Sequence, residues 1–575
     1  MTSTSAMNHP IPDRMGVNAY TDDPDFAGLV QLYLGDALSA HLAPHLHELG
    51  RRVGREIDQL ALTADQHPPT LQSRNRQGMN DQRVLKHPAY VAMEQIAFGD
   101  YGLAAMSHRA GVLGWPQPLP PAVKYSLTYL LVQAEFGLCC PLSMTDSLTR
   151  TLRKYGAPEL VERYLDGLTS QDLSALTQGA MFMTEQGAGS DVAATETRAT
   201  IAPECGPGVY RLHGDKWFCS NPDASLAMVL AHVDGEPEGM RGVSLFLLPR
   251  VLPNGTPNSY RIVRLKDKLG TRSMASGEIT LEGAQAWLVG ELGRGFVQMA
   301  DMVNNSRLSN GMRAAGLMRR AVAEALFISR HRRAFGKHLI EMPLMQVQLA
   351  KMLGKAEQAR TLMFQTAQAL SRADQGEPGA YALTRLLTPL IKYRATRDAR
   401  TVAGDALEVR GGCGYIEEWS DARVLRDAHL GSVWEGTSNI VALDVLRAIQ
   451  REGSLSVWQD HMNGLLDATP WHPAVRAVLG PLLARVSGLA QGSAEQKDEA
   501  QARRVAGALY HLTSAIAMGW EAHHTQNPRR MVLAQCVLVH RLLPRDPLVP
   551  HSVAHLDVLW STESPVGPVD AICLL

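Results

Sequence analysis

The segment GVYRLHGDKWFCSN (residues 208–221) alternates apolar and polar side chains, a pattern typical of a half-buried β-strand. Similar short segments follow it, separated by turn residues, at 224–235, 242–250, 259–265 and 275–284. Strands at this hairpin spacing predict a compact β-barrel or sandwich, which we place at residues 176–290.

The sequence on both sides of this β segment has helical periodicity. Before it, LVQLYLGDALSAHLAPHLHELGRRVGREIDQLA (29–61) repeats apolar residues every three or four positions. After it come three long amphipathic helices and the start of a fourth, which predict an up-and-down bundle. We therefore expect an α+β multidomain chain with four parts: an N-terminal arm and α-helical domain (1–175), the middle β domain (176–290), a C-terminal helical bundle (291–452) and an additional helical segment (453–575).

Composition narrows the functional classes. The 575 residues include 56 Lys+Arg and 57 Asp+Glu, so the formal net charge is −1 and no general basic field attracts nucleic acid or anionic membrane. The seven cysteines are odd in number and form no C-x-x-C pair, so neither a disulfide framework nor a metal site is predicted. The N-terminal residues lack a signal-peptide pattern, and no apolar run is long enough to span a membrane. We expect a soluble, cytoplasmic protein.

A glycine-rich segment, MTEQGAGSDVAATETRA (183–199), lies at the transition from helix to β-strand. Glycines expose backbone N–H groups, and the hydroxyls of Thr184 and Ser190 add donors. Together with Met183 and Gly189, they predict a site for a phosphate or an electron-rich ring carbonyl. The alternative is an ordinary glycine turn, because the segment lacks the lysine of a P-loop.

The segment GDKWFCSNPDA (214–224) ends the first predicted strand. Its aromatic residues and Ser220 are suited to place a ring plane and a hydroxyl beside a flat cofactor, with Phe218 and Cys219 in contact. The alternative is that these side chains belong to the core of the β domain.

A basic segment, RHRRAFG (330–336), ends a predicted helix. Arginine clamps phosphate with a planar fork of donors, and an aromatic ring stacks on adenine, so Arg332 and Phe335 are candidates for binding a nucleotide. A solvated basic helix end is the alternative.

The segment EVRGGCGYIEEWSDARVLRDAHLGSVWEGTSNI (408–440) joins two predicted helices. The first is expected to end at Gly411 and Gly412 in a glycine C-cap. Trp434 and Glu435 are expected to open the second, with Thr437, Ser438 and Asn439 as potential capping residues. In a cleft beside Trp434, Glu435 would be desolvated and suited to act as a base. The alternative is a first-turn carboxylate that stabilises the helix dipole.

In this order and in this helical–β–helical frame, the four segments resemble the flavin-dependent acyl-CoA dehydrogenase family. The resemblance extends over about residues 80–450. Within the family, the chain is most similar to the adaptive-response, AidB-like branch. The segments that carry this similarity are MTEQGAGSDV, DKWFCS, RLKDKLGTRSMAS, RRAFGKHLIEMPLM and SVWEGTSNIVALDVLR. Pro343 and Glu408, which stand where many dehydrogenases have glutamine, also fit this branch better than the fatty-acid enzymes.

The resemblance implies specific roles around one flavin ring. Glu435 matches the catalytic base, which removes the α-proton of an acyl thioester while a hydride leaves the β-carbon for flavin N5. Thr184 matches a hydroxyl on the pyrimidine edge of the flavin, and Ser220 matches one that faces N5. Ser190 matches a contact to the pyrophosphate or the substrate. Arg307 stands near the family's substrate-facing arginine.

The resemblance also implies an assembly. Arg332, Phe335, Gly411 and Gly412 match residues that reach the FAD of a neighbouring subunit. The remaining FAD contacts are expected at Met183, Gly189, Phe218, Cys219, Trp434, Thr437 and Asn439. We therefore expect a homotetramer that binds FAD and an acyl-CoA thioester and passes electrons to an electron-transferring flavoprotein.

A DNA-binding flavoprotein of the alkylation response is the rival hypothesis, since the AidB-like branch binds duplex DNA through a basic C-terminal segment. From residue 451 onward this chain has ten Lys+Arg and eleven Asp+Glu. Nonspecific DNA binding needs many cations that neutralise phosphates, so this balance disfavours DNA as a partner. Folding would have to gather Arg503, Arg504, Arg529 and Arg530 on one face to reverse that conclusion.

Overall fold

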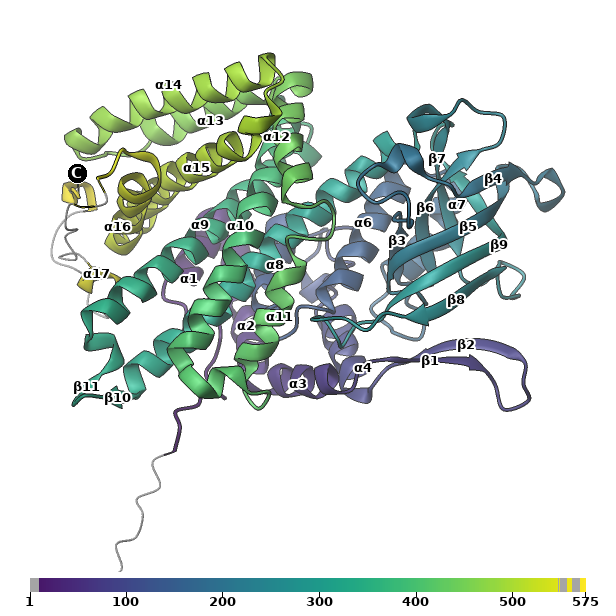
Figure 1. Ribbon diagram of the computed structural model, residues 1–575, viewed down its shortest axis with the longest axis horizontal. Helices are drawn as coiled ribbons and strands as arrows, with labels where there is room; N and C mark the ends of the chain where they lie inside the picture. Colours follow the sequence, from purple (N-terminus) through teal and green to yellow (C-terminus); the bar gives the residue numbers. More distant parts are fainter. Residues whose placement is uncertain (1–9, 547, 549–555, 561–568, 575) are drawn as a thin grey trace, which may run out of the picture.

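The computed structural model describes residues 10–546, 548, 556–560 and 569–574. The β domain lies at one end of the molecule and the long helices at the other, with α6 and its neighbours between them (Figure 1). The structure has a helical N-terminal domain, a β-barrel and a helical C-terminal domain. This is the acyl-CoA dehydrogenase fold, as expected from the sequence.

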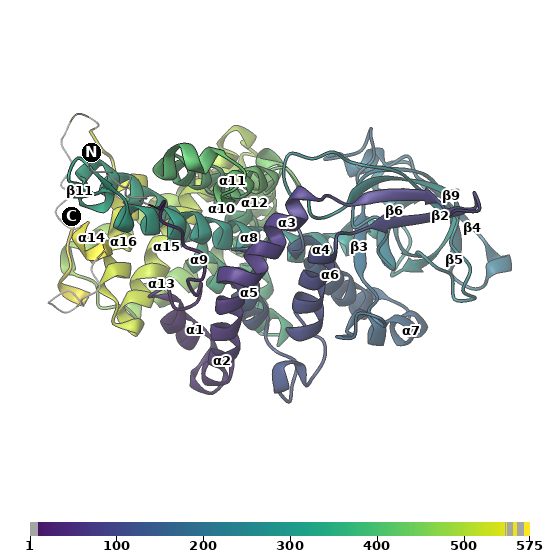
Figure 2. The same cartoon turned by 90° about the horizontal axis from the view of Figure 1, so that it is seen from below.

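The N-terminal part is helical, as predicted, except for one hairpin. Its helices are α1 (Phe26–Leu34), α2 (Asp36–Arg52), α3 (Asp58–Gln66), α4 (Pro88–Glu94), α5 (Pro121–Leu131), α6 (Cys139–Tyr155) and α7 (Pro158–Leu168). The hairpin of β1 (Thr70–Arg74) and β2 (Asn80–Leu85) extends along the β domain (Figure 2). Gln82 holds it there, because its side chain donates to the Ile262 carbonyl at 2.9 Å and accepts from the Ile262 N–H at 2.7 Å.

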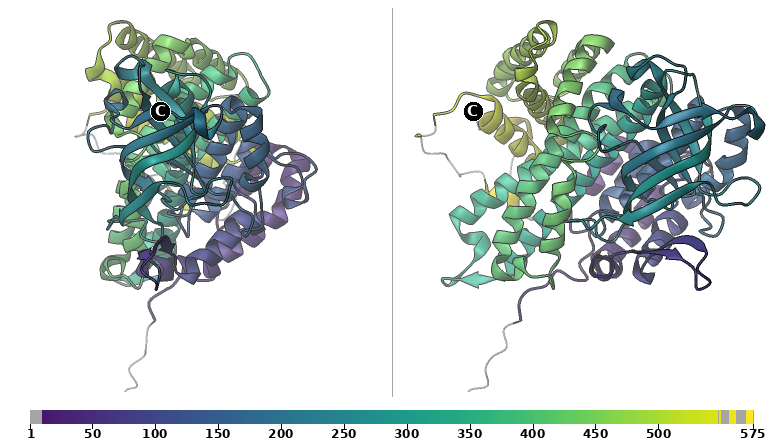
Figure 3. Two further views of the ribbon diagram at one scale, coloured as in Figure 1. Left: turned by 90° about the vertical axis from the view of Figure 1, so that its right-hand side faces the viewer. Right: turned by 45° about the vertical axis from the view of Figure 1, so that its right-hand side comes forward.

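The β segment forms a closed ring of strands. The strands are β3 (Gly179–Phe182), β4 (Arg198–Ile201), β5 (Val209–Ser220), β6 (Leu226–Val233), β7 (Val243–Pro249), β8 (Tyr260–Leu265) and β9 (Ser276–Val289). Pairing runs β6–β4–β5–β9–β7 and back to β6, while β3 adds to β6 and β8 adds to β9 (Figure 3). Alternate side chains such as Phe182, Leu212 and Phe246 fill the interior.

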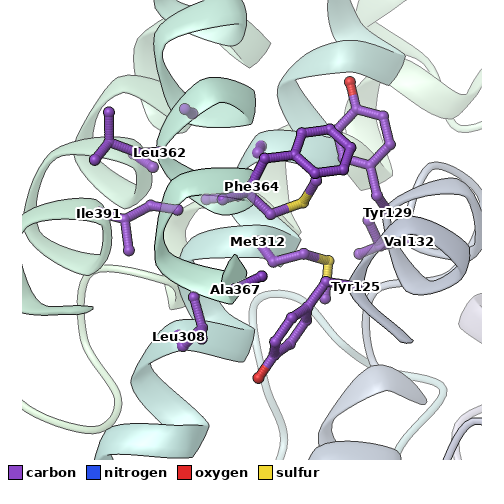
Figure 4. Close-up of a cluster of buried hydrophobic side chains, with 14 of the residues drawn as sticks. Tyr125, Tyr129, Val132, Leu308, Met312, Leu362, Phe364, Ala367 and Ile391 are labelled. Atoms are coloured by element: carbon purple, nitrogen blue, oxygen red, sulfur yellow. The ribbon is translucent and has the colours of Figure 1, made fainter. Parts of the chain in front are cut away.

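The second helical part is a bundle. It comprises α8 (Gly295–His331), α9 (Pro343–Asp374), α10 (Ala380–Arg410), the shorter α11 (Ser420–Leu430) and α12 (Ser438–Glu452). Helix α9 begins at Pro343 and α10 ends before Gly411, whose φ is +77°, as the helix-boundary signals predicted. Figure 4 shows Phe364, Met312 and Ile391 in the core with Tyr129 of α5. Burying each such side chain contributes about 1.5–3 kcal/mol.

The C-terminal helices pack on the bundle. They are α13 (Ser454–Asp467), α14 (Pro473–Glu495), α15 (Ala502–Thr525), α16 (Pro528–Val537) and the short α17 (Asp557–Trp560); parts of the predicted helical segment 453–575 lie outside the described residues. Within the described residues, no helix combines the length and apolar character needed to cross a membrane.

The positions of the C-terminal arginines weaken the DNA hypothesis further. Arg530 is fully buried, where it pairs with Glu357 of α9 at 2.8 Å and with Glu521 of α15. The Arg529 side chain is 13% exposed and faces Asp25. These two arginines are therefore engaged inside the protein, and of the four candidates only Arg503 and Arg504 are exposed.

Candidate active site

Glu435 lies in the turn between α11 and α12, with its backbone in the left-handed region. Its φ is +56°, which is costly for a residue with a side chain, and Gly436 follows at +98°. Two cations hold this turn. Arg307 Nε donates to the Glu435 carbonyl at 3.0 Å, and Lys392 Nζ donates to the Gly436 carbonyl. Arg307 in turn pairs with Asp444 at 2.8 Å, so the turn is fixed to α8, α10 and α12.

The Glu435 carboxylate is enclosed, with 6% of the side chain exposed. Its Oε1 accepts a hydrogen bond from the Ser306 hydroxyl, and Arg313 Nη2 lies 3.9 Å from the same oxygen. Ser306 and Arg313 are seven residues apart on α8 and thus share one face of the helix. Within the described residues, Oε2 has no hydrogen-bond partner. One carboxylate oxygen is thus available to take a proton from a ligand.

Two aromatic rings and a thiol surround the carboxylate. Trp434 stacks on Phe136 with 6.1 Å between ring centroids, and the Arg313 guanidinium carbon lies 4.6 Å from the Trp434 ring centre. The Cys140 thiol lies beside Arg313 and the Ser220 hydroxyl. Burial raises the pKa of Cys140, while both neighbours oppose this increase. The end of β5 and the turn that carries Glu435 therefore converge.

Buried lysines add positive charge near this place. Burial lowers the pKa of Lys392 to about 7; the Glu435 charge opposes the decrease, whereas Arg307 and Arg313 reinforce it. Burial likewise lowers the pKa of Lys268 to about 8. Lys268 donates to the Met274 carbonyl at 2.6 Å. With Arg307 and Arg313, Lys392 makes the surroundings of the carboxylate electropositive, and Lys268 adds a cation near Cys140.

The glycine-rich segment is an open loop on a buried anchor. Glu185, inside the motif, pairs with the fully buried Lys216 of β5, and Lys216 holds the pKa of this carboxyl below its usual range against the effect of burial. The loop beyond it is exposed at Gly189 and Ser190, and an added Cβ at Gly189 would contact nothing within 4 Å. In the part of the chain that the structure describes, the hydroxyls of Thr184 and Ser190 form no hydrogen bond. Met183, half-buried, packs against the core at the start of the loop.

The end of β5 presents alternate side chains to opposite sides. Phe218 is 59% exposed and lies beside Trp217, over which the Lys266 ammonium sits 3.4 Å from the ring centre. Ser220, two residues on, faces Cys140. Cys219 lies between them in sequence and points into the barrel core. Any contact of Cys219 with a cofactor would therefore involve its backbone.

The turn before α12 differs in detail from expectation. Helix α12 begins at Ser438, so Glu435 precedes the helix and is not a first-turn carboxylate. Thr437 occupies the N-cap position, but no side chain caps this end. Thr437 and Asn439 are exposed instead.

Four other predicted cofactor residues lie together at the end of the bundle that is distant from Glu435: Arg332, Phe335, Gly411 and Gly412. Arg332 Nη1 donates to the Arg410 carbonyl at 3.0 Å and lies 3.5 Å from where a Cβ on Gly411 would be. Phe335, at the tip of the β10 (Arg333–Ala334) and β11 (Lys337–His338) hairpin, is 97% exposed. Gly412 has open space around it.

This second group is far from Glu435. Arg332 follows α8 directly, whereas Ser306, which contacts Glu435, is 26 residues earlier in the same helix. At a rise of about 1.5 Å per residue, their Cα atoms are roughly 39 Å apart. In one chain, the structure does not bring the two groups of predicted cofactor residues together.

Sequence reasoning missed several residues of the site: Phe136, Cys140, Ser306, Arg313 and Lys392. A signal existed for Arg313 and Lys392, since each is a cation on an otherwise buried stretch of a long helix. Burial of such a charge needs a partner or a function. The other three are ordinary core residue types and carried no signal.

The donors of the site suit a flavin dinucleotide. The open loop at Gly189, the hydroxyls of Thr184 and Ser190, and the exposed ring of Phe218 offer backbone donors, polar groups and an aromatic surface. These are the groups that phosphate and a flat heteroaromatic ring require. The residues present therefore fit FAD.

Sequence models of three families match the chain in succession. They are the adaptive response protein AidB N-terminal domain (residues 9–174), the acyl-CoA dehydrogenase middle domain (180–284) and the acyl-CoA dehydrogenase C-terminal domain (293–450). Acyl-CoA dehydrogenase family member 11 of Caenorhabditis elegans is 32% identical over 79% of this chain and 74% of its own. The putative acyl-CoA dehydrogenase AidB of Escherichia coli is 32% identical over 78% and 81%.

A solved structure agrees with these matches. Caenorhabditis elegans ACDH-11 in complex with C11-CoA superposes with a TM-score of 0.86 at 28% identity, over 94% of each chain. The chain belongs to the acyl-CoA dehydrogenase family, whose members are typically FAD-dependent oxidoreductases that act on CH–CH groups. Within the family, its N-terminal domain places it in the AidB-like branch.

Proposed function

We propose that this protein is an FAD-dependent dehydrogenase that oxidises the α,β-bond of an acyl-CoA thioester, with Glu435 as the base. The observation that carries the proposal is the enclosed carboxylate with one unpartnered oxygen, close to the Cys140 thiol, which also contacts the hydroxyl that ends β5. A base must reach its proton directly, and the rigid turn around Glu435 provides a fixed position for it.

The chain contributes a proton acceptor and a positive environment. Glu435 takes the α-proton on Oε2, while Ser306 holds Oε1. As negative charge develops on the thioester, the protonated fraction of Lys392 lowers its energy. FAD, when bound, supplies the acceptor for the hydride that leaves the β-carbon, since no side chain accepts a hydride. Trp434 and Phe136 exclude water from this space.

The proposed FAD contacts fall into two sets. Thr184, Ser190, Phe218 and Ser220 would surround the ring and its side chain, and Arg332, Phe335, Gly411 and Gly412 would hold the other end of the dinucleotide. The separation of roughly 39 Å between Ser306, which contacts Glu435, and Arg332 exceeds the reach of one dinucleotide. We therefore propose that the second set serves the FAD of a neighbouring subunit, in a homotetramer. An electron-transferring flavoprotein as acceptor and a cytoplasmic location complete the proposal.

The test is a panel of acyl-CoA thioesters scored by anaerobic bleaching of the flavin. Glu435→Gln should retain FAD, because Glu435 makes none of the proposed FAD contacts, but should reduce the bleaching rate by about 100- to 10,000-fold. Ser454→Ala, at a buried position in α13 outside the proposed site, is the control. Equal rates in Glu435→Gln and in the wild type would remove Glu435 from its role.

A further inference from the structure

Arg313 is a buried cation whose donors are not satisfied. The residue is 0% exposed, and Nε donates to the Ser309 carbonyl at 3.3 Å. Both terminal nitrogens, Nη1 and Nη2, lack a hydrogen-bond partner in the described part of the chain. They carry four N–H donors, and each buried donor without an acceptor costs free energy. Such a side chain points to a ligand that supplies the missing acceptors.

The protein groups around Arg313 do not fill this need. Trp434 and Phe136 offer ring faces, and the Cys140 thiol is a weak acceptor. Among the described residues, Glu435 is the one acidic residue that comes within 4.0 Å of the guanidinium. Its Oε1 lies 3.9 Å from Nη2, which is beyond hydrogen-bond length, and already accepts a hydrogen bond from Ser306. The guanidinium therefore lies next to the base with both terminal nitrogens unpaired among the described residues, so a ligand that reaches the base would also meet these donors.

A planar fork of donors matches a carboxylate, which accepts two parallel hydrogen bonds from it. The ligand in this space, on the proposed function, is the acyl part of a thioester. We propose that Arg313 binds a carboxylate at the far end of the acyl chain, so that the substrates are short dicarboxylyl-CoA thioesters. This inference rests on the proposed function and names its substrate class.

The geometry limits the length of the acyl chain. Reacting atoms lie about 3–3.5 Å apart, so the α-carbon would lie that far from the Glu435 carboxylate. Arg313 Nη2 is 3.9 Å from Oε1 of this carboxylate. The distal carboxylate must therefore lie within roughly 10 Å of the α-carbon, once a hydrogen bond of about 2.8 Å is added. Thioesters of succinate, glutarate and adipate are suitable probes.

The experiment compares these three thioesters with butyryl-, pentanoyl- and hexanoyl-CoA, which match them in chain length. For the wild-type holoenzyme we expect a higher kcat/KM for the dicarboxylyl member of the best pair, by about 10- to 100-fold. Arg313→Met should abolish this ratio, and Arg313→Lys, which keeps the charge but loses the fork, should restore part of it. Retained FAD absorbance and an unchanged melting temperature verify the fold of each variant.

A binding measurement separates substrate recognition from chemistry. In the Glu435→Gln background, calorimetric titration with glutaryl-CoA should show at least about 10-fold weaker binding when Arg313→Met is added, and pentanoyl-CoA should show no such difference. The inference is overturned if the wild type has the higher kcat/KM for the monocarboxylyl series, or if Arg313→Met weakens the binding of both series equally. Either result leaves the proposed function intact. Bleaching by neither series overturns both.

Discussion

At the scale of single residues, the position of Glu435 depends on backbone contacts more than on side-chain packing. The left-handed turn is held because Arg307 and Lys392 bind its two successive carbonyls. The structure therefore places two buried cations beside the base, and one of them titrates near neutrality. A buried lysine that loses its proton on folding leaves a measurable pH dependence of stability.

We expect Lys392→Met to change how stability depends on pH. The pKa of Lys392 falls from its ordinary value of 10.5 to about 7 in the folded protein. Between these values the unfolded chain binds a proton that the folded protein does not, so the free energy of unfolding of the wild type should rise with pH, by about 1.4 kcal/mol per unit. Urea unfolding of wild type and variant at pH 7, 8 and 9 measures this. Parallel curves would contradict it.

How far the site could be predicted depends on the type of residue. Glu435, Ser220 and the glycine loop could be proposed because they lie in segments that resemble the family. Arg313 was overlooked because its signal, a cation in a long helical stretch, does not by itself tell whether the side chain is solvated or buried. Cys140 and Phe136 approach Glu435 only through tertiary packing, since almost 300 residues separate them from it in the chain.

At the scale of elements, helical periodicity predicted the long helices well, and the β1–β2 hairpin was missed. Its strands, TLQSR and NDQRVL, are largely polar, so they lack the alternation that marks a strand. They are stabilised by pairing and by the Gln82 contact to β8, which the sequence does not reveal. The way the C-terminal helices pack on α9 is a second feature that the sequence does not reveal, because it depends on buried ion pairs.

We expect Arg530→Met to destabilise the protein by about 3–5 kcal/mol, because it leaves Glu357 and Glu521 buried without their partner. Chemical denaturation, read by tryptophan fluorescence, measures the loss. Arg503→Met on the exposed side of α15 is the matched control and should change stability by less than about 0.5 kcal/mol. A similar small effect of both substitutions would show that the network contributes little.

At the scale of the whole molecule, the two ends of α8 carry different parts of the proposed cofactor site. Exposed apolar side chains mark the end that is distant from Glu435: Phe335 is 97%, Leu344 86% and Tyr415 81% exposed. Large apolar side chains that gather at one end of a chain are typical of a surface that another molecule contacts. This supports an assembly in which copies complete each other's sites.

Phe335→Asp should therefore weaken both assembly and FAD retention, because a carboxylate at this position would be desolvated in the interface. Light scattering coupled to size-exclusion chromatography, with the ratio of flavin to protein absorbance, reports both properties. Ile201→Asp, at a 64% exposed position in β4, is the control and should leave both unchanged. A Phe335→Asp protein with wild-type mass and full flavin content would contradict the proposed assembly.

The ion network at Arg530 has a consequence for the synthesis of the protein. Asp25, near the start of the chain, accepts from Asn527 at 2.8 Å and lies 3.6 Å from Arg530. The acidic groups of the N-terminal arm thus find part of their counter-charge only after about 500 further residues have been translated. During translation these carboxylates remain hydrated or bind elsewhere, so we expect this region to consolidate only once residues 527–530 have left the ribosome.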